Sequence, residues 1–243
     1  TVKQVEEFKA KAVQADEFKA KFDAVEKERK ELAEKFTAEQ MIRDAVASLV
    51  SWDYSLFAPV EQNEEKKDAM QRELDEEVVR LIAVYTPVAA DLRLLMMAAR
   101  INAELERIGD KAVDIGFYAK TMLQERPIKP LVDLPRMADI AMDMVRRSVD
   151  AFAEGSCEKA LAVIAMDDQV DRLNDQIFRE LMTYVIGDPK TITRVMELVL
   201  ISRSFERIAD HAVNIGEDIV YMVKGEDIRH VKGAGEARPE ALR

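Results

Sequence analysis

The chain has 243 residues, of which 48% are hydrophobic and 34% are charged, and its formal net charge is -11. A negative field of this size repels nucleic acids and anionic membranes, so neither is expected as the main partner. The single cysteine, Cys157, excludes an intramolecular disulfide and a zinc site built from several cysteines. With 8 Gly and 7 Pro in the chain, the composition favours long helices, and we predict an all-α fold.

The chain begins with a charged, alanine-rich stretch in which apolar residues recur at heptad-like spacings. This pattern predicts an extended amphipathic helix within residues 1–36. Thr37 then precedes an apolar stripe that continues to Trp52. We expect the helix that carries this stripe to end near Pro59, because proline disrupts a helix interior.

Prolines and glycines set the bounds of the helices that follow. No apolar run approaches the roughly 20 residues that span a bilayer, so direct membrane insertion is not expected. The stretch after Lys224 carries three glycines and a proline, and residues 226–243 are expected to form a frayed tail. Between these prolines and glycines we predict five helices, at 61–84, 88–124, 137–153, 158–186 and 191–224.

The two halves of the chain repeat each other at a shift of 100 residues. Between Leu105 and Gly116, eight of twelve positions are identical to Phe205 through Gly216. Each helix buries one stripe, so three helices joined by short loops can enclose a core. We therefore predict two tandem homologous three-helix bundles related by pseudo-twofold symmetry, at residues 37–126 and 127–225.

Each repeat carries a column of oxygen-bearing side chains at spacings of four residues, which lie on one shallow face of a helix. Like charges at this spacing oppose helix formation, so a duplicated column calls for a compensating cation. Hard divalent or trivalent ions prefer oxygen ligands, and iron, manganese, magnesium or zinc are all left open. The columns are Glu106, Asp110 and Asp114 in the first repeat and Glu206, Asp210 and Asn214 in the second.

A salt-bridged surface is the alternative interpretation of these columns, because nearby Arg107, Lys111, Arg203 and Arg207 can neutralise the acids. Two copies in identical register favour the metal site, since duplicated salt bridges need not preserve the same acids. The carboxylate at the last position of the first column also predicts that this column holds its cation more tightly.

The identical alanine, isoleucine and glycine residues between the acids are attributed to core packing. Gly116 and Gly216, like the Gly109 and Ala209 pair, are predicted to permit close helix approach.

Three segments resemble the PhoU family of accessory and regulatory proteins of bacterial phosphate transport: Pro87–Ile115, Met166–Asp175 and Arg203–His230. The resemblance implies two three-helix bundles with multinuclear metal clusters on the two columns. It also implies negative regulation of phosphate uptake and of the phosphate-starvation response.

Asp68 and Asp168, one on the preceding helix of each unit, are further candidate ligands because the 100-residue shift exchanges them. Asp171 has no acidic twin, since its partner is Gln71.

Protein partners follow from the same resemblance: the ATPase of the phosphate ABC transporter and the phosphate sensor histidine kinase. We therefore expect a cytoplasmic signalling adaptor rather than an enzyme, and a homodimer is left open. A metal-dependent phosphohydrolase is the alternative, but the sequence contains no G-x-x-x-x-G-K-[ST] loop, nucleophile elbow or HExxH motif. A third interpretation is the soluble regulatory domain of a larger sodium/phosphate transporter, because the chain begins at Thr1.

Overall fold

A computed structural model describes the backbone of residues 38–229 and the side chains of residues 40–60 and 68–229. All regular structure in this part of the chain is helical, as predicted, and includes two short 3-10 turns, η1 (Tyr54–Phe57) and η2 (Pro189–Thr191). The helix predicted within residues 1–36 lies outside the described residues. The helices are α2 (Ala38–Ser51), α3 (Ala58–Tyr85), α4 (Ala90–Met122), α5 (Asp133–Glu154), α6 (Cys157–Ile164), α7 (Asp167–Gly187) and α8 (Ile192–Lys224).

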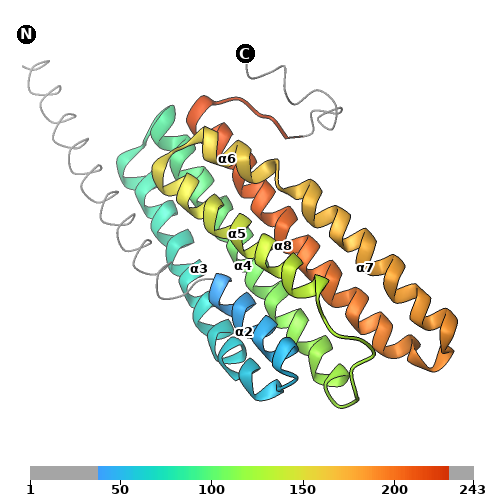
Figure 1. Cartoon of the computed structure of the whole chain (residues 1–243). Helices are drawn as coiled ribbons and strands as arrows, with labels where there is room; N and C mark the ends of the chain where they lie inside the picture. Colours follow the sequence, from blue (N-terminus) through green and yellow to red (C-terminus); the bar gives the residue numbers. More distant parts are fainter. Residues whose placement is uncertain (1–37, 230–243) are drawn as a thin grey trace, which may run out of the picture.

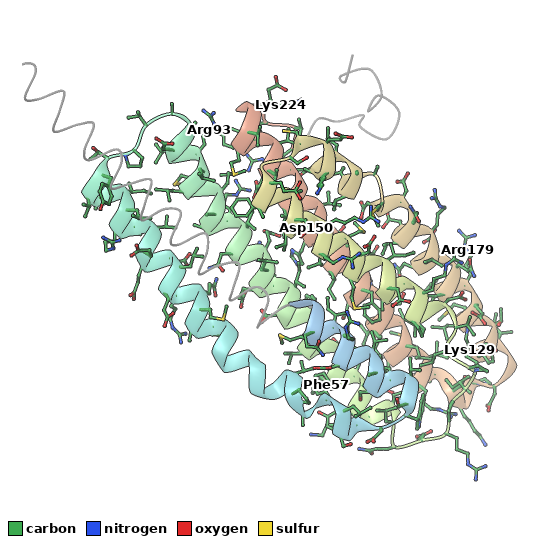
Figure 2. All side chains as sticks on the ribbon, turned by 60° about the vertical axis from the view of Figure 1, so that its left-hand side comes forward. Phe57, Arg93, Lys129, Asp150, Arg179 and Lys224 are labelled. Atoms are coloured by element: carbon green, nitrogen blue, oxygen red, sulfur yellow. The ribbon has the colours of Figure 1, made fainter. Side chains whose placement is uncertain are left out.

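The two longest helices, α4 and α8, pack against each other in antiparallel directions at the centre of the molecule (Figure 1). At one end Arg93 Nε donates to the carbonyl oxygen of Met222 at 3.4 Å, and at the other Arg194 Nη1 donates to that of Arg126 at 2.9 Å. Figure 2 shows the same arrangement, with Arg93 at the start of α4 near Lys224 at the end of α8. No helix in the described part of the chain is long and apolar enough to cross a membrane.

The remaining helices repeat one arrangement around this central pair. Helix α3 packs on α4, as α6 and α7 pack on α8, while α2 covers α4 and α5 covers α8. Helices α2 and α5 also contact each other. Each repeat therefore supplies three helical layers, and the predicted pair of three-helix bundles is confirmed.

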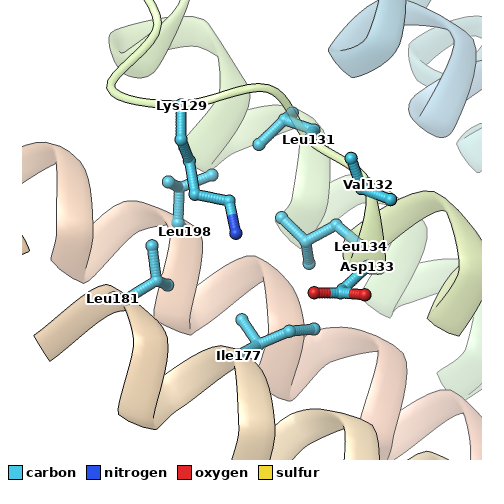
Figure 3. A pocket seen from close by; sticks show the side chains of 8 residues that line it. All are labelled: Lys129, Leu131, Val132, Asp133, Leu134, Ile177, Leu181 and Leu198. Carbon is cyan, nitrogen blue, oxygen red and sulfur yellow. The ribbon is translucent and has the colours of Figure 1, made fainter. Parts of the chain in front are cut away.

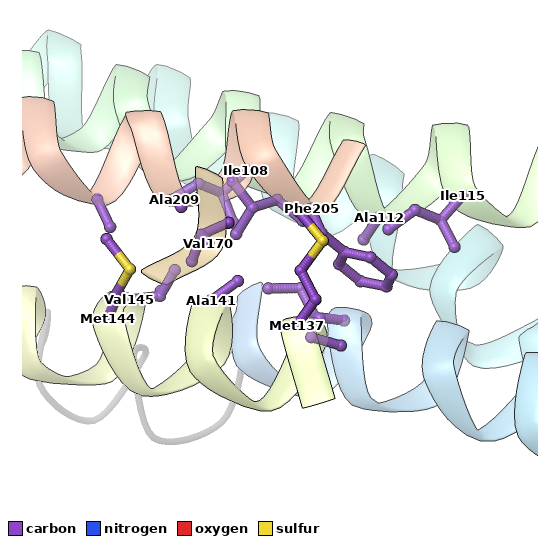
Figure 4. Close-up of a cluster of buried hydrophobic side chains, with 14 of the residues drawn as sticks. Ile108, Ala112, Ile115, Met137, Ala141, Met144, Val145, Val170, Phe205 and Ala209 are labelled. Atoms are coloured by element: carbon purple, nitrogen blue, oxygen red, sulfur yellow. The ribbon is translucent and has the colours of Figure 1, made fainter. Parts of the chain in front are cut away.

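The repeated apolar residues form one continuous core that both bundles share (Figure 4). Equivalent positions in α4 and α8 are equally inaccessible: Ile108 and Ile208 are both 0% exposed, as are Ala112 and Ala212. Fully burying an isoleucine side chain stabilises a fold by roughly 1.5–3 kcal/mol. The prediction that these identities reflect core packing is confirmed.

The repeated glycines permit close packing against earlier segments of the same repeat, η1 at Gly116 and α6 at Gly216. A Cβ atom on Gly116 would lie 1.7 Å from Cζ of the buried Phe57 ring, so no larger residue fits without moving that ring. A Cβ atom on Gly216 would lie 3.0 Å from Ile164 Cγ1 and 3.1 Å from the carbonyl oxygen of Ala160. The predicted close helix approach is therefore confirmed at Gly216, against α6, whereas at Gly116 the still tighter contact is made by the Phe57 ring of η1.

The predicted end of the first described helix near Pro59 is wrong. Helix α2 ends at Ser51, Trp52 adopts a positive φ of 55°, and Pro59 lies in the first turn of α3. Proline suits this position because the first backbone N–H groups of a helix lack an intrahelical acceptor. The residue that was expected to end one helix thus begins the next.

The single helix predicted at 158–186 is also wrong, because the structure divides it into α6 and α7 at Ala165 and Met166. Their N–H groups donate to the carbonyl oxygens of Leu161 and Val163, which closes a tight turn without glycine or proline. Asp167 and Asp168 then occupy the first turn of α7, where acidic side chains favour a helix start.

Candidate metal centre

In each repeat, a hydrogen bond fixes how the helix that carries the column is aligned with the helix before it. In the second repeat Ser202 Oγ donates to Asn174 Oδ1 at 2.6 Å, which joins α8 to α7. In the first repeat Asn102 Nδ2 donates to the carbonyl oxygen of Gln71 at 3.3 Å, which joins α4 to α3. Because both pairs of helices run antiparallel, moving one turn back along the earlier helix corresponds to moving one turn forward along the later helix.

This register brings carboxylates of α7 toward the column of α8. Burial raises the pKa of Asp171, and the negative charges of Asp210, Asp168 and Asp175 raise it further. Burial also raises the pKa of Glu206, as do Asp210 and Asp171, against the opposing charges of Arg203 and Arg207. The acidic cluster of the second repeat, defined as Glu206, Asp210, Asp168 and Asp171, therefore combines carboxylates from two helices.

Asp171 is the ligand candidate that the sequence comparison set aside. Its twin is Gln71, yet the charge of Asp210 raises the pKa of Asp171, and the charge of Asp171 raises the pKa of Glu206. Its spacing of three residues from Asp168 places both on one side of α7 and was the available signal.

In the first repeat the predicted ligands occupy the corresponding helices. Gln71 and Asn102 fix the register, so Asp68 lies one turn before Gln71 on α3, at the level of Glu106 on α4. Asp68, Glu106 and Asp110 are all partly exposed. They occupy positions equivalent to Asp168, Glu206 and Asp210 of the second repeat, and their role as metal ligands stays a prediction.

The last residue of each column, Asp114 or Asn214, is hydrogen-bonded to a residue outside the column. Asp114 Oδ2 accepts a hydrogen bond from Lys111 Nζ at 2.6 Å within the same helix. Asn214 Nδ2 instead donates to Glu104 Oε2 on α4 at 3.0 Å. Asn214 thus bridges the two repeats, and its role as a metal ligand, like that of the other column residues, stays a prediction.

The acidic cluster of the second repeat carries the oxygen ligands that a hard cation prefers. Its side chains, however, are not oriented to surround one ion in this structure. Asp210 Oδ2 accepts a hydrogen bond from Arg207 Nη1 at 3.0 Å, which directs this carboxylate toward its own helix. Among the described residues, no three His, Cys, Asp or Glu side chains converge closely enough to hold one ion. Binding would therefore require Asp210 to exchange Arg207 for the cation, a change of rotamer on an exposed face.

A shallow pocket lies away from both columns, beneath the loop that joins α4 to α5 (Figure 3). Leu131, Leu134, Ile177, Leu181 and Leu198 give it a mostly apolar lining. The Lys129 side chain extends into the pocket and forms an ion pair with Glu180, which attaches the loop to α7. The pocket therefore reflects how the loop packs on the second bundle and adds no acid to the candidate centre.

Comparisons with known proteins agree with the repeat and with the fold. The PhoU domain model matches the chain twice, at residues 30–119 and 134–219. The phosphate-specific transport system accessory protein PhoU homolog of Pseudomonas putida is 39% identical over 194 residues, covering 79% of this chain and 76% of that protein. The corresponding Escherichia coli protein is 37% identical over 195 residues, covering 80% and 81%. The crystal structure of PhoU from Pseudomonas aeruginosa has a TM-score of 0.76 at 32% identity and covers 88% of this chain and 99% of that chain.

Proposed function

Because the chain belongs to the PhoU family, we propose that it is an accessory regulator of phosphate transport that binds metal and acts through protein contacts. Its relatives in Pseudomonas putida and Escherichia coli are named as accessory proteins of the phosphate-specific transport system. We place the protein in the cytoplasm, where it would restrain phosphate uptake and the phosphate-starvation response. Its partners there would be the transporter ATPase and the phosphate sensor histidine kinase.

One observation supports the metal-binding part of this proposal above the others. Carboxylates of α7 and α8 raise one another's pKa, so their negative charges repel across the boundary between the two helices. A bound cation would neutralise this repulsion and tie α7 to α8 through oxygen ligands. In this repeat Glu206, Asp210, Asp168 and Asp171 would hold the ion, and in the first repeat Glu106, Asp110 and Asp68 would do so.

The regulatory role is tested by deleting the gene in phosphate-replete cells. Phosphate-scavenging genes should then be expressed as though phosphate were scarce, and the intact gene should restore repression. Unchanged expression after deletion would refute the negative regulation proposed above.

The metal-binding role is tested on protein purified anaerobically without chelators. We expect bound metal in the intact protein and a lower metal content when Asp171 and Asp210 are both replaced by Asn, because the first repeat keeps its ligands. Asp150→Asn is the matched control, because Asp150 is an exposed aspartate of α5, on a different element (Figure 2). Equal metal content in the double variant and the control would show that the acidic cluster is not the site.

A further inference from the structure

A polar cluster between α4 and α8 is centred on a residue that belongs to neither column. Its centre is Glu104 of α4, which is 8% exposed. Two residues of α8 reach Glu104 Oε2: His211 Nδ1 lies 2.7 Å away and Asn214 Nδ2 donates at 3.0 Å. Arg107 Nη1 donates to the other oxygen, Oε1, at 2.7 Å. Both oxygens of a buried carboxylate are thus satisfied, and one of them only by the opposite repeat.

Glu104 is ionised at neutral pH despite its burial. Burial opposes its charge, but hydrogen bonds from His211 and Asn214 and the charges of His211 and Arg107 outweigh it and lower its pKa below the ordinary value. Hydrogen bonds to an ionised group are stronger than those between neutral groups, so this contact resists separation of the two helices.

The helical segments that meet at Glu104 also carry the candidate metal ligands. His211 directly follows Asp210, Asn214 lies one turn beyond it, and Glu104 is two residues before Glu106. An α-helix transmits rotation and translation along its length because its backbone is hydrogen-bonded throughout. A shift of α8 relative to α7 on metal binding would therefore also move His211 and Asn214 relative to Glu104.

The repeat provides this contact only at Glu104. Its twin in α8 is Ser204, whose Oγ donates to the carbonyl oxygen of Leu200 within its own helix. Lys111 and Asp114, the twins of His211 and Asn214, pair with each other. Duplication alone therefore does not explain the contact, which arose by divergence at three facing positions.

We propose that Glu104 is a positioning residue that couples the acidic cluster of the second repeat to the column of the first repeat across the α4–α8 boundary. This inference rests on the proposed metal-binding function, and it adds that occupancy of one repeat changes the properties of the other. Couplings of this kind typically alter affinity by about 5–150-fold.

The test compares Glu104→Ser, which introduces the residue of the twin position, with Glu104→Gln, which keeps the shape and removes the charge. Glu77→Ser is the matched control, because Glu77 also pairs with an arginine three residues away, Arg80 on α3, and belongs to neither column. In each background, Mn²⁺ binding to the first column is titrated calorimetrically with the second cluster intact or neutralised by Glu206→Gln and Asp210→Asn.

With Glu104 present, neutralising the second cluster should change the Mn²⁺ affinity of the first column by at least about fivefold. The ratio of the two Mn²⁺ affinities, measured with the second cluster intact and neutralised, should approach one in Glu104→Ser. It should fall partly in Glu104→Gln and stay unchanged in Glu77→Ser. The same ratio in Glu104→Ser as in the unsubstituted protein would overturn the proposal.

A second measurement needs no metal. Amide hydrogen exchange of residues 100–108 in α4 is followed when Glu206→Gln and Asp210→Asn are introduced into α8. We expect a change in exchange with Glu104 present and none with Glu104→Ser, and an equal response in both would reject the coupling. If Mn²⁺ bound neither repeat, the proposed metal function would fail while the exchange experiment still decided the role of Glu104.

Discussion

Replacing Asn214 by Asp should destabilise the protein at neutral pH, because it sets a second carboxylate against a buried one. Asn214 Nδ2 now donates to Glu104 Oε2 at 3.0 Å, and aspartate at this position offers no donor when ionised. From the sequence alone, the same substitution would be expected to strengthen a metal site. The geometry adds an electrostatic cost inside the α4–α8 boundary before any metal is bound.

The size of this cost follows from two contributions. Losing a hydrogen bond to a charged group costs about 1.5–3 kcal/mol. Two like charges about 4 Å apart repel by roughly 4 kcal/mol at an effective dielectric of 20. Because Asn214 is exposed, its replacement can rotate into water, which reduces the repulsion to about 1 kcal/mol. We therefore expect Asn214→Asp to lower the free energy of unfolding by about 3 kcal/mol.

Urea denaturation of Asn214→Asp and Asn214→Ala at pH 7 separates the two contributions, since alanine removes the donor without adding charge. The repulsion raises the folded-state pKa of a carboxyl above its unfolded value, so its cost is present at neutral pH and disappears as the pH falls below about 4. Combining Asn214→Asp with Glu104→Gln should likewise remove the part of the stability loss that the repulsion causes. Equal stability of the Asp and Ala variants at pH 7 would refute the electrostatic reasoning.

Two further predictions concern packing and ionisation. Gly116→Ala should lower the free energy of unfolding by about 2–3 kcal/mol because its methyl group overlaps the buried Phe57 ring. In thermal unfolding, Gly216→Ala should lose less stability than Gly116→Ala. The reverse order would contradict the packing described above. Asp171 and Glu206 have folded-state pKa values raised by burial and by neighbouring carboxylates, so their contribution to metal-free stability should decline as the pH rises through those values. Mn²⁺ binding should then release protons, and calorimetric heats that do not depend on the ionisation enthalpy of the buffer would disprove this.

The parts of the fold that were predictable are those in which neighbouring residues along one helix carry the information. Ile108, Ala112 and their twins Ile208 and Ala212 recur at helical spacing, so their burial followed from the repeat. Pro59 was misread because proline favours both the end of one helix and the first turn of the next. The local sequence does not distinguish these two positions.

The candidate site was predictable only within each column. Glu206 and Asp210 share a face of one helix, which their spacing of four residues specifies. The contribution of Asp171 depends on how α7 packs on α8, and the contact between Glu104 and His211 depends on how α4 packs on α8. Such pairings depend on how the helices pack in the shared core. A search for acids that recur in both repeats also leaves out residues such as Asp171 and Glu104, at which the two repeats differ.

That divergence leads to a different expectation from the one that the sequence alone favours. Counting charges along the columns favoured tighter metal binding in the first repeat, because Asp114 is replaced by Asn214 in the second. The structure pairs Asp114 with Lys111, which reduces its availability to a cation, whereas α7 adds Asp171 to the second cluster.

We therefore expect the second repeat to bind Mn²⁺ more tightly, and Asp171→Asn to bring its affinity toward that of the first. An added carboxylate that contributes a net 1–2 kcal/mol changes affinity by roughly tenfold. Titrations of variants with one repeat neutralised at a time measure this order directly. Tighter binding by the first repeat would show that Asp114 leaves Lys111 for the metal and that the number of acids on the column helix sets affinity.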